Sequence, residues 1–194
     1  MKVLVETSAR HVHLSKDSIK VLFGDNYNLT PKRYLSQPEQ FVCAEKVEIV
    51  GLKGSIKGVS VLGPLRSKTQ VEISLTDARK IGISAPIRES GDLYRTAGCE
   101  IIGPNGKYAL KEGVIAAKRH IHVPLNEVKE HLFTDGQIVR VKIDSTDRSG
   151  ILDDVIIRIS DKFELAMHID TDEANALGLN GNVDTYGEII LKNG

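Results

Sequence analysis

The sequence predicts a mainly β protein with short capping helices, built as two pseudo-symmetric β-barrels related by internal duplication. Short β-type runs separated by glycines predict the barrels, and they fill most of residues 47–115 and 138–191. Two copies of Arg-His-X-His, in "ARHVHLSKDSIKVLFG" and "AKRHIHVPLNEVKEHLF", predict the duplication. A second repeat supports it, because "VEISLTDARKIGI" (residues 71–83) aligns without gaps on "MHIDTDEANALGL" (residues 167–179).

The first elements after the N-terminal strand are a histidine strand and a short helix. Ser15 is a suitable N-cap for a helix over Lys16–Phe23, and Gly24 follows the helix end. The polar segment over residues 24–40 contains two prolines, and we interpret it as a surface excursion rather than a linker between domains.

The middle and the end of the chain carry most of the strands. The runs "KVEIVGLKG", "QIVRVKID" and "DVIIRIS" are typical of strands, and "GCEIIGPNGKYALKEG" predicts a hairpin in which "PNG" supplies positive-φ turn residues. A second helix is expected over Leu125–Phe133, where Pro124 can begin a helix without losing a hydrogen bond.

Composition limits the classes of function. The 194 residues are 41% hydrophobic and 27% charged, which is typical of a globular protein. Lys and Arg number 26 and Asp and Glu also 26, so no overall basic field would attract nucleic acid or an anionic membrane surface. We find neither a run of about 18 apolar residues nor an export signal, and we therefore expect a cytoplasmic protein without a membrane partner.

The two Arg-His-X-His copies each provide a pair of possible metal ligands. On a strand, residues i and i+2 point to the same face, so His11 and His13 project together, as do His120 and His122. A single His-X-His is also compatible with an exposed polar strand face. Imidazole is a preferred ligand of zinc. Two copies of the pair, together with the third residues that the second repeat supplies, favour a metal site over an exposed strand face.

The second repeat provides the missing ligands. Its alignment places Glu72 opposite His168, so each half would contribute two histidines and one further ligand. A catalytic zinc site keeps one position open for water or substrate. Nitrogen-rich sites of this kind also accept cobalt, nickel or copper.

Several other reactive residues have simpler interpretations. His131 is expected at a helix end, where a partial positive charge is favourable. Arg10 and Arg119 should point away from the histidine pairs and bind acidic neighbours. Cys43 and Cys99 lack the CxxC spacing and are interpreted as small buried hydrophobic residues.

Arg66 in "LGPLRSKTQVEIS" lies six residues before Glu72. A guanidinium beside a metal pair can bind a phosphate with two hydrogen bonds, although a surface arginine on a loop fits the spacing equally well. Dinucleotide, Walker-type, zincin and α/β-hydrolase motifs do not occur in the sequence.

Five segments together resemble one family: "RHVHLS", "LGPLRSKTQVEIS", "ESGDLYRTAGCEIIGP", "AAKRHIHV" and "HIDTDEANALG". They look like the phosphate propanoyltransferase family of phosphotransacylases, which is associated with propanediol-using microcompartments. The resemblance implies the interconversion of a short-chain acyl-CoA (propanoyl or acetyl) plus phosphate with acyl phosphate plus CoA. It also implies that residues 1–9 and 118–194 form one barrel and residues 10–117 the other, with the active site at their interface.

The resemblance further implies two zinc ions per chain, in a dinuclear site. The positions that match the family's zinc ligands are His11, His13, Glu72, His120, His122 and His168. Arg66 matches its phosphate-binding arginine and would be the catalytic residue, while Asn175 is our expectation for a contact to coenzyme A. Direct transfer in a ternary complex would then need no serine or cysteine nucleophile.

Two rival functions and several properties stay open at this point. A di-zinc hydrolase of a thioester or phosphate ester could use the same ligands, and a non-enzymatic metal- or nucleotide-binding double barrel could share the fold. The acyl chain, the reaction's physiological direction and a homo-oligomeric state are also open. Only nine residues precede Arg10, whereas encapsulated members carry an N-terminal extension, so we expect a free cytoplasmic enzyme unless a partner recruits it to a microcompartment.

Overall fold

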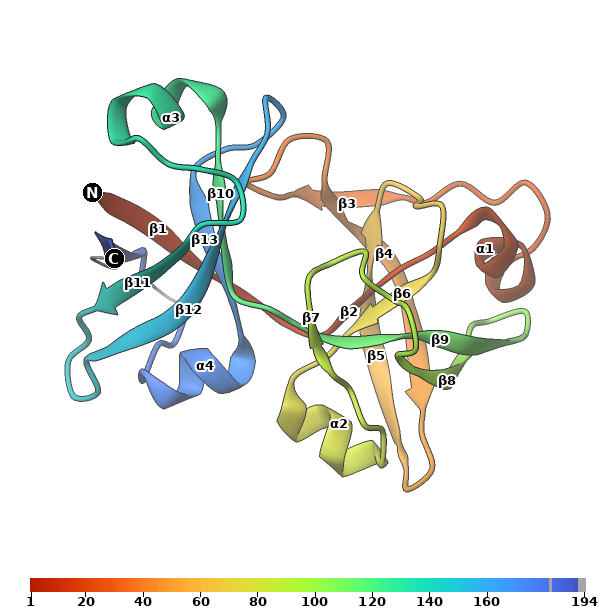
Figure 1. Ribbon diagram of the computed structural model, residues 1–194. Helices are drawn as coiled ribbons and strands as arrows, with labels where there is room; N and C mark the ends of the chain where they lie inside the picture. The colour runs from red at the N-terminus through yellow and green to blue at the C-terminus, as the bar shows by residue number, and fades with distance from the viewer. Residues whose placement is uncertain (182, 192–194) are drawn as a thin grey trace. The chain divides into compact units, whose positions relative to one another are not determined.

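The computed structural model describes residues 1–181 and 183–191, which form two compact units (Figure 1). Unit 1 comprises residues 1–8, 36–38 and 118–194, and unit 2 comprises residues 9–35 and 39–117. Each unit has its own apolar core, with Ile121 and Met167 fully buried in unit 1 and Val61 and Ile101 fully buried in unit 2.

Unit 1 is a closed barrel of six strands. In the order of their pairing these are β1 (Lys2–Ser8), β13 (Ala166–Asp170), β10 (His120–Val123), β12 (Gly150–Ile159), β11 (Ile138–Ile143) and β14 (Thr185–Leu191). Buried and exposed residues alternate along β11, as expected for a strand with one face on the core. Two short helices, α3 (Leu125–His131) and α4 (Thr171–Ala176), accompany the barrel.

Unit 2 contains a second ring of six strands. In pairing order these are β4 (Phe41–Val50), β5 (Ser55–Gly63), β2 (His11–His13), β6 (Gln70–Glu72), β9 (Lys107–Ala117) and β8 (Ala97–Ile102), which pairs with β4 and closes the ring. Strand β3 (Pro31–Tyr34) flanks β4, and β7 (Ile87–Arg88) flanks β9. The helices are α1 (Lys16–Phe23) and α2 (Leu75–Ile81). The prediction of two barrels with short helices is therefore confirmed.

The strand pairings repeat from one unit to the other, which confirms the internal duplication. Strand β2 lies parallel to β5 and antiparallel to β6, and β10 lies parallel to β12 and antiparallel to β13. Strand β6 is in turn parallel to β9, as β13 is to β1. Strand β1 belongs to unit 1 but continues into β2 of unit 2, and β9 of unit 2 continues into β10 of unit 1. The chain thus changes unit just before each histidine pair.

The ends of α1, α2 and α4 coincide with local sequence signals. Helix α1 spans Lys16–Phe23 as predicted, with a capping box at Ser15. Helices α2 and α4 fall on aligned positions of the repeat, and Gly82 and Gly178 after them both adopt left-handed conformations, with φ of 75° and 68°. A residue without a side chain tolerates this conformation best, so both glycines are suited to ending a helix.

Helix α3 ends at His131, two residues before the predicted end at Phe133, because Leu132 adopts a left-handed conformation (φ 54°). The predicted surface excursion over residues 24–40 is largely exposed, as expected, but it contains strand β3 and one buried side chain, Gln37. The Gln37 side chain forms hydrogen bonds with both the backbone carbonyl and the N–H of Glu164, which attaches this segment to unit 1.

The hairpin of β8 and β9 is present, but the backbone conformation of its turn differs from the prediction. Neither Asn105 nor Gly106 has a positive φ. The turn instead packs on the end of α1, where the Asn105 backbone N–H donates to the Leu22 carbonyl and its side chain donates to the Phe23 carbonyl. A Cβ added at Gly103 would lie 2.5 Å from the Leu22 oxygen, so close approach is the reason for glycine at this position.

Gly103→Ala is expected to lower the free energy of unfolding by about 1–3 kcal/mol, because the hairpin turn must move away from α1. Gly54→Ala is the matched control, since an added Cβ there meets nothing closer than 4.0 Å, and its effect should stay within about 0.5 kcal/mol. Urea denaturation followed by circular dichroism measures both. Equal stability of the two variants would contradict the packing described for the turn.

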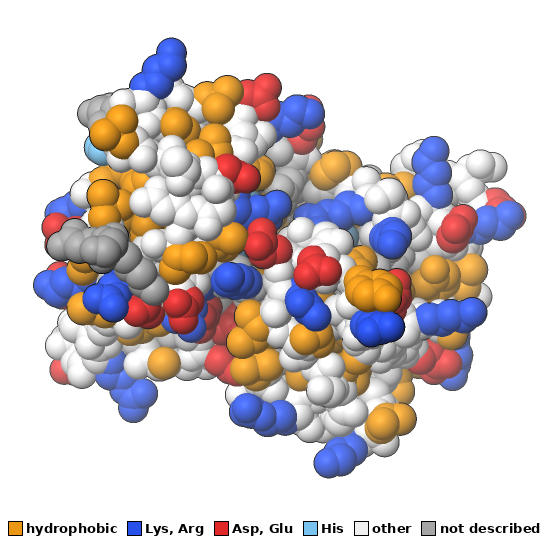
Figure 2. Space-filling view, viewed as in Figure 1, with side chains coloured by type: hydrophobic (Ala, Val, Ile, Leu, Met, Phe, Trp, Pro, Cys, Tyr) orange, Lys and Arg blue, Asp and Glu red, His pale blue; other side chains and the backbone are white. Residues whose placement is uncertain are grey.

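The face shown in Figure 2 has no dominant charge. Lys and Arg side chains are interspersed there with Asp and Glu side chains in each unit, in keeping with the balanced composition. Among the described residues, no helix combines the length and the apolar character needed to span a bilayer.

Candidate metal centres

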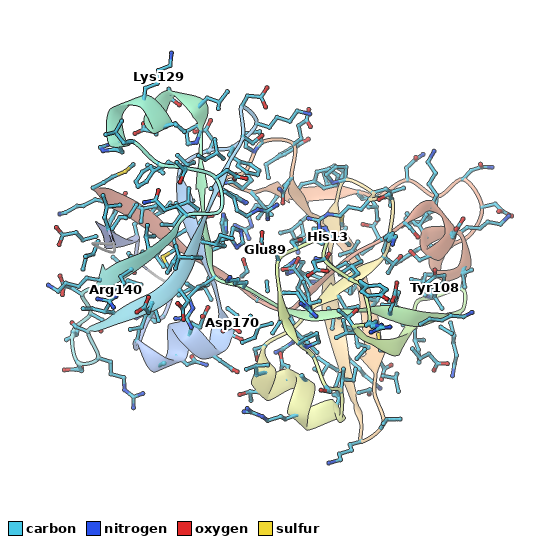
Figure 3. The ribbon with its side chains drawn as sticks, in the orientation of Figure 1. His13, Glu89, Tyr108, Lys129, Arg140 and Asp170 are labelled. Carbon is cyan, nitrogen blue, oxygen red and sulfur yellow. The ribbon has the colours of Figure 1, made fainter. Side chains whose placement is uncertain are left out.

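Three side chains of unit 2 form the first candidate centre, which we call cluster 2: His11, His13 and Glu72. Strands β2 and β6 are antiparallel neighbours with His11 directly opposite Glu72. The Nε2 atom of His11 lies 3.5 Å from Oε2 of Glu72, and Nε2 of His13 lies 3.8 Å from Oε1. One ligand atom from each residue lies within 4.8 Å of the others. His13, labelled in Figure 3, is only 2% exposed.

Three histidines of unit 1 form the second centre, cluster 1: His120, His122 and His168. Strands β10 and β13 are antiparallel neighbours with His120 directly opposite His168. The three imidazoles again offer ligand atoms within 4.8 Å of one another. Within each unit, the structure therefore brings together the three residues that the two repeats predict.

The first histidine of each pair is held by the same hydrogen bond. Nδ1 of His11 lies 2.8 Å from the Ala9 carbonyl oxygen, and Nδ1 of His120 lies 2.9 Å from the Lys118 carbonyl oxygen. A carbonyl only accepts, so Nδ1 must carry the proton and donate. This arrangement directs Nε2 toward the cluster, as in metal sites where the second ring nitrogen binds a carbonyl.

Electrostatics favours the protonation states that a metal requires. Burial, together with the charges of His11 and Arg66, lowers the pKa of His13 well below its ordinary value. Burial and the neighbouring His120, His168 and Arg158 lower the pKa of His122 to about 2. Both rings are therefore neutral at neutral pH and have a lone pair available.

The remaining two ligands of cluster 2 form an ion pair. Burial alone would raise the pKa of Glu72, but the charge of His11, its hydrogen bond to the carboxylate and the charge of Arg66 hold that pKa well below its ordinary value. Burial opposes protonation of His11, yet the Glu72 carboxylate outweighs it and raises the pKa of that imidazole. A bound cation would take the place of the His11 proton.

Two buried ring nitrogens test whether a metal fits these centres. Nδ1 of His13 and Nδ1 of His122 are buried and have no hydrogen-bond partner within the described residues. A buried polar atom without a partner is costly, and native proteins rarely leave one. The two atoms occupy equivalent positions in the repeats, and nitrogen and carboxylate donors suit zinc. The donor sets therefore fit a metal ion in each cluster.

Arg66 lies beside cluster 2, together with two residues that the sequence did not reveal. Its Nη1 donates a 2.9 Å hydrogen bond to the Ser90 hydroxyl, which donates to Oε1 of Glu72. Ser90 also accepts from the buried amide of Gln70. Gln70 precedes Glu72 by two residues on β6, so the same alternation that selects His11 and His13 could have found it. Ser90 comes from the loop between β7 and β8, within the segment "ESGDLYRTAGCEIIGP" that carries part of the resemblance, but neither spacing nor repetition predicts that it reaches the site.

The other predicted residues lie outside the clusters. Arg10 forms an ion pair with Asp77 at 3.0 Å and Arg119 with Glu173 at 2.8 Å, as predicted, and these pairs occupy aligned positions of the repeats. Asn175 lies exposed on α4. Its contact with coenzyme A stays a prediction.

The cysteines and the sixth histidine also have structural explanations. Cys43 is fully buried, and burial raises its pKa to about 11, while burial raises the pKa of the half-buried Cys99 to about 12. Neither thiol would ionise at neutral pH. His131 ends α3, as predicted, and its Nε2 lies 3.6 Å from the Glu127 carboxylate one turn earlier.

Cluster 1 has an aromatic neighbour that the sequence did not indicate. The ring of Phe163 stacks on His122 with centroids 4.0 Å apart, and the Arg158 guanidinium lies 5.9 Å from the Phe163 centroid. Phe163 thereby covers one face of a predicted metal ligand. The loop before β13 brings it there, so only the tertiary structure could reveal the contact.

Comparisons with known proteins identify the family to which this chain is similar. The family model for phosphate propanoyltransferase matches residues 4–180. All six members of the two clusters lie within that span, as do Arg66 and Asn175.

Three phosphate propanoyltransferases are similar to this chain over most of their length. The phosphate propanoyltransferase of Thermotoga maritima is 51% identical over 178 residues, which cover 92% of this chain and 85% of that protein. The phosphate propanoyltransferase of Listeria monocytogenes is 49% identical, over 98% of this chain and 88% of that protein. The one from Leptotrichia buccalis is 52% identical, over 90% and 82% of the two chains.

Proposed function

The chain belongs to the phosphate propanoyltransferase family and is an acyltransferase, and from this we propose that it transfers a propanoyl or acetyl group between coenzyme A and inorganic phosphate. We also propose that it works with two zinc ions, one held by cluster 1 and one by cluster 2. The observation that carries the metal proposal is the pair of buried, unpartnered Nδ1 atoms at equivalent positions, on His13 and His122.

The residues assigned to each ion follow from the clusters. His11, His13 and Glu72 would hold one ion, and His120, His122 and His168 the other. With three protein ligands each, the ions would have a coordination position available for substrate. A bound zinc ion acts as a Lewis acid that polarises a carbonyl group and stabilises a thiolate leaving group. The carboxylate makes the ligand set of cluster 2 more negative than that of cluster 1.

Arg66 is the residue that we assign to phosphate. Its guanidinium is fixed at one nitrogen by Ser90, and it lies close enough to Glu72 to lower the pKa of that carboxyl group. A fork of N–H donors can bind two phosphate oxygens and leave a third directed at the thioester carbon. Arg66 would thus supply both orientation and charge compensation.

The proposed reaction needs no nucleophile from the protein. An oxygen of phosphate attacks the thioester carbonyl carbon, the new C–O bond forms, and the C–S bond breaks with the electron pair leaving on the CoA sulfur. The proton that hydrogen phosphate loses balances the charge of the thiolate, so acyl phosphate and CoA are the products. The high pKa values of Cys43 and Cys99 argue against a covalent acyl-cysteine intermediate.

Cys99→Ala is expected to keep the rate of acyl transfer within about twofold of the unchanged protein, because the Cys99 thiol has no role in direct transfer. Steady-state rates with acetyl-CoA and propanoyl-CoA measure it. A loss of 100-fold or more, together with acylated Cys99 in the mass spectrum of the unchanged protein, would contradict direct transfer.

The decisive experiment follows the thioester absorbance of acetyl-CoA and propanoyl-CoA with and without phosphate. Loss of absorbance that requires phosphate, stops on chelation and returns with zinc is the result expected. Loss without phosphate would instead identify a thioester hydrolase that uses the same ligands. The ratio of the two rates identifies the acyl group, whose single-methylene difference is worth about 1–3 kcal/mol.

Four further expectations stay predictions: the domain boundaries implied by the resemblance, a shared dinuclear centre at the barrel interface, a homo-oligomer and a cytoplasmic location. Magnetic coupling between two Co²⁺ ions substituted for zinc would test the dinuclear centre. Light scattering during size-exclusion chromatography would test the oligomer. Contact of coenzyme A with Asn175 predicts a higher KM for CoA in Asn175→Ala.

A further inference from the structure

Gln70 is a fully buried polar side chain beside cluster 2 that nothing in the proposed chemistry uses. It lies on β6, two residues before Glu72, and is 1% exposed. Its amide makes three hydrogen bonds, to Oε1 of Glu72, to the Ser90 hydroxyl and from the Gly91 backbone N–H. Burying an amide this completely is favourable only when its polar atoms have partners.

The bond from Gly91 fixes which way the amide faces. A backbone N–H only donates, so the Gln70 atom that it meets at 2.8 Å must be the carbonyl oxygen. The NH₂ group must therefore face Glu72 and Ser90, and both of its hydrogens are used. The amide has one favourable orientation in this site, with its donors on the carboxylate side.

Ser90 connects this amide to the phosphate-binding arginine. Its hydroxyl accepts from Gln70 at 2.9 Å and from Nη1 of Arg66 at 2.9 Å, and it donates to Oε1 of Glu72 at 3.1 Å. Oε1 of Glu72 thus receives two hydrogen bonds from neutral donors. Oε2 lies on the other side, 3.5 Å from Nε2 of His11.

The duplication supplies a comparison within the same chain. Gln70 lies directly opposite His13 on the neighbouring strand, and Ala166 occupies the corresponding place opposite His122 in unit 1. Cluster 1 has a histidine, His168, where cluster 2 has Glu72. A carboxylate has two equivalent oxygens and can turn about its last bond, whereas the imidazole offers one nitrogen to the cluster. At the position opposite the second histidine of the pair, cluster 2 therefore has an amide and cluster 1 has an alanine.

We propose that Gln70 is a positioning residue that, together with Ser90, holds Oε1 of Glu72 and leaves Oε2 as the ligand atom of cluster 2. Through Ser90 it also fixes the Arg66 guanidinium relative to that ligand. The metal ion and the phosphate would then be placed by one hydrogen-bonded unit. This inference deepens the proposed function and rests on its assignment of zinc to cluster 2.

Gln70→Met tests the proposal, because methionine has nearly the same length and volume but donates no hydrogen bond. Loss of a group that orients a metal ligand typically weakens metal binding about 10–100-fold. We expect the affinity for one zinc ion to fall by that factor, while the affinity for the other, in cluster 1, stays unchanged. Zinc competition with a chromophoric chelator measures both affinities in the same full-length chain.

Two further variants separate positioning from folding. Gln37→Met removes a buried amide in unit 1 that is 3% exposed and forms two hydrogen bonds with the Glu164 backbone. It should therefore lower the free energy of unfolding about as much as Gln70→Met does. It should leave the cluster 2 affinity unchanged. Ser90→Ala provides a second test if Gln70→Met does not fold. It is expected to fold because Ser90 lies on a partly exposed loop. It should weaken zinc binding at cluster 2 and raise the KM for phosphate severalfold with a smaller change in the KM for CoA.

The outcomes distinguish this inference from the proposed function. If the unchanged protein binds no zinc, the proposed function fails and the inference with it. If it binds two zinc ions and Gln70→Met keeps both affinities and the KM for phosphate, only the inference is overturned. Equal weakening by Gln37→Met and Gln70→Met would also overturn it, because the effect would then come from folding alone.

Discussion

Replacing His13 by alanine is expected to remove one of the two zinc ions and to lower kcat/KM for acyl transfer by about 1000-fold or more. His13 is buried, its imidazole is neutral at neutral pH, and its Nδ1 has no partner within the described residues. A metal ion contributes several kcal/mol of charge stabilisation in a transition state, and each 1.4 kcal/mol is tenfold in rate. Metal analysis by plasma mass spectrometry and the thioester assay measure the two effects.

His122→Ala should have the same effect through the other cluster. It occupies the equivalent position in the second repeat, opposite Ala166 on β13, and burial lowers its pKa to about 2. Each variant should therefore retain one zinc ion per chain and lose most of the activity. Equal losses from both would mean that the reaction needs both clusters.

The sixth histidine provides the matched control. His131 ends α3, and His131→Ala removes its contacts with Glu127 and with the Phe133 ring, neither of which belongs to a cluster. It should keep two zinc ions and the full rate. A His13→Ala protein that keeps both zinc ions and its activity would show that cluster 2 is not a metal site.

The repeats made much of the fold and of both clusters predictable from the sequence. Alternation along a strand places His11 beside His13, and the alignment of the two repeats places Glu72 and His168 as third ligands. The prediction was possible because the duplication gives two copies of each feature. The N-cap at Ser15 and the glycines that follow α2 and α4 are local signals, and they can also be recognised in the sequence.

Features that depend on tertiary contacts were not predictable in this way. The turn before Gly106 is shaped by the end of α1, and the segment that contains Gln37 is held by the backbone of Glu164, more than a hundred residues later. Ser90 reaches cluster 2 from a loop whose sequence resembles the family but has no spacing or repeat that indicates this contact. In each case the partner is distant in sequence, and periodicity reports only on neighbours along the chain.

The hydrogen bonds of cluster 2 also distinguish between two interpretations of Arg66. From the sequence, a surface arginine and a phosphate-binding one were equally compatible with its spacing. In the structure it lies beside Glu72 and is held by the Ser90 hydroxyl, which an ordinary surface arginine would not require. The Arg66 side chain is therefore partly ordered before phosphate binds, which reduces the conformational entropy that it loses on binding.

Arg66→Ala is accordingly expected to raise the KM for phosphate by about 10–100-fold, since a hydrogen bond to a charged group contributes about 1.5–3 kcal/mol. The KM for CoA should change by less than about threefold, because the guanidinium is assigned to phosphate alone. Initial rates at varied phosphate and fixed acyl-CoA, and the reverse, separate the two constants. If only the KM for CoA rose, Arg66 would belong to the coenzyme site instead.

Two variants show whether charge or shape matters at this position. Arg66→Lys keeps the positive charge but loses the planar fork, so its KM for phosphate should lie between those of the unchanged protein and Arg66→Ala. Lys68→Ala removes an exposed cation two residues further along the same loop and should leave both KM values unchanged. An equal rise in the KM for phosphate in Lys68→Ala and Arg66→Ala would mean that general positive charge on the loop attracts phosphate. A rise confined to Arg66 would mean that phosphate binds at the guanidinium that Ser90 holds beside Glu72.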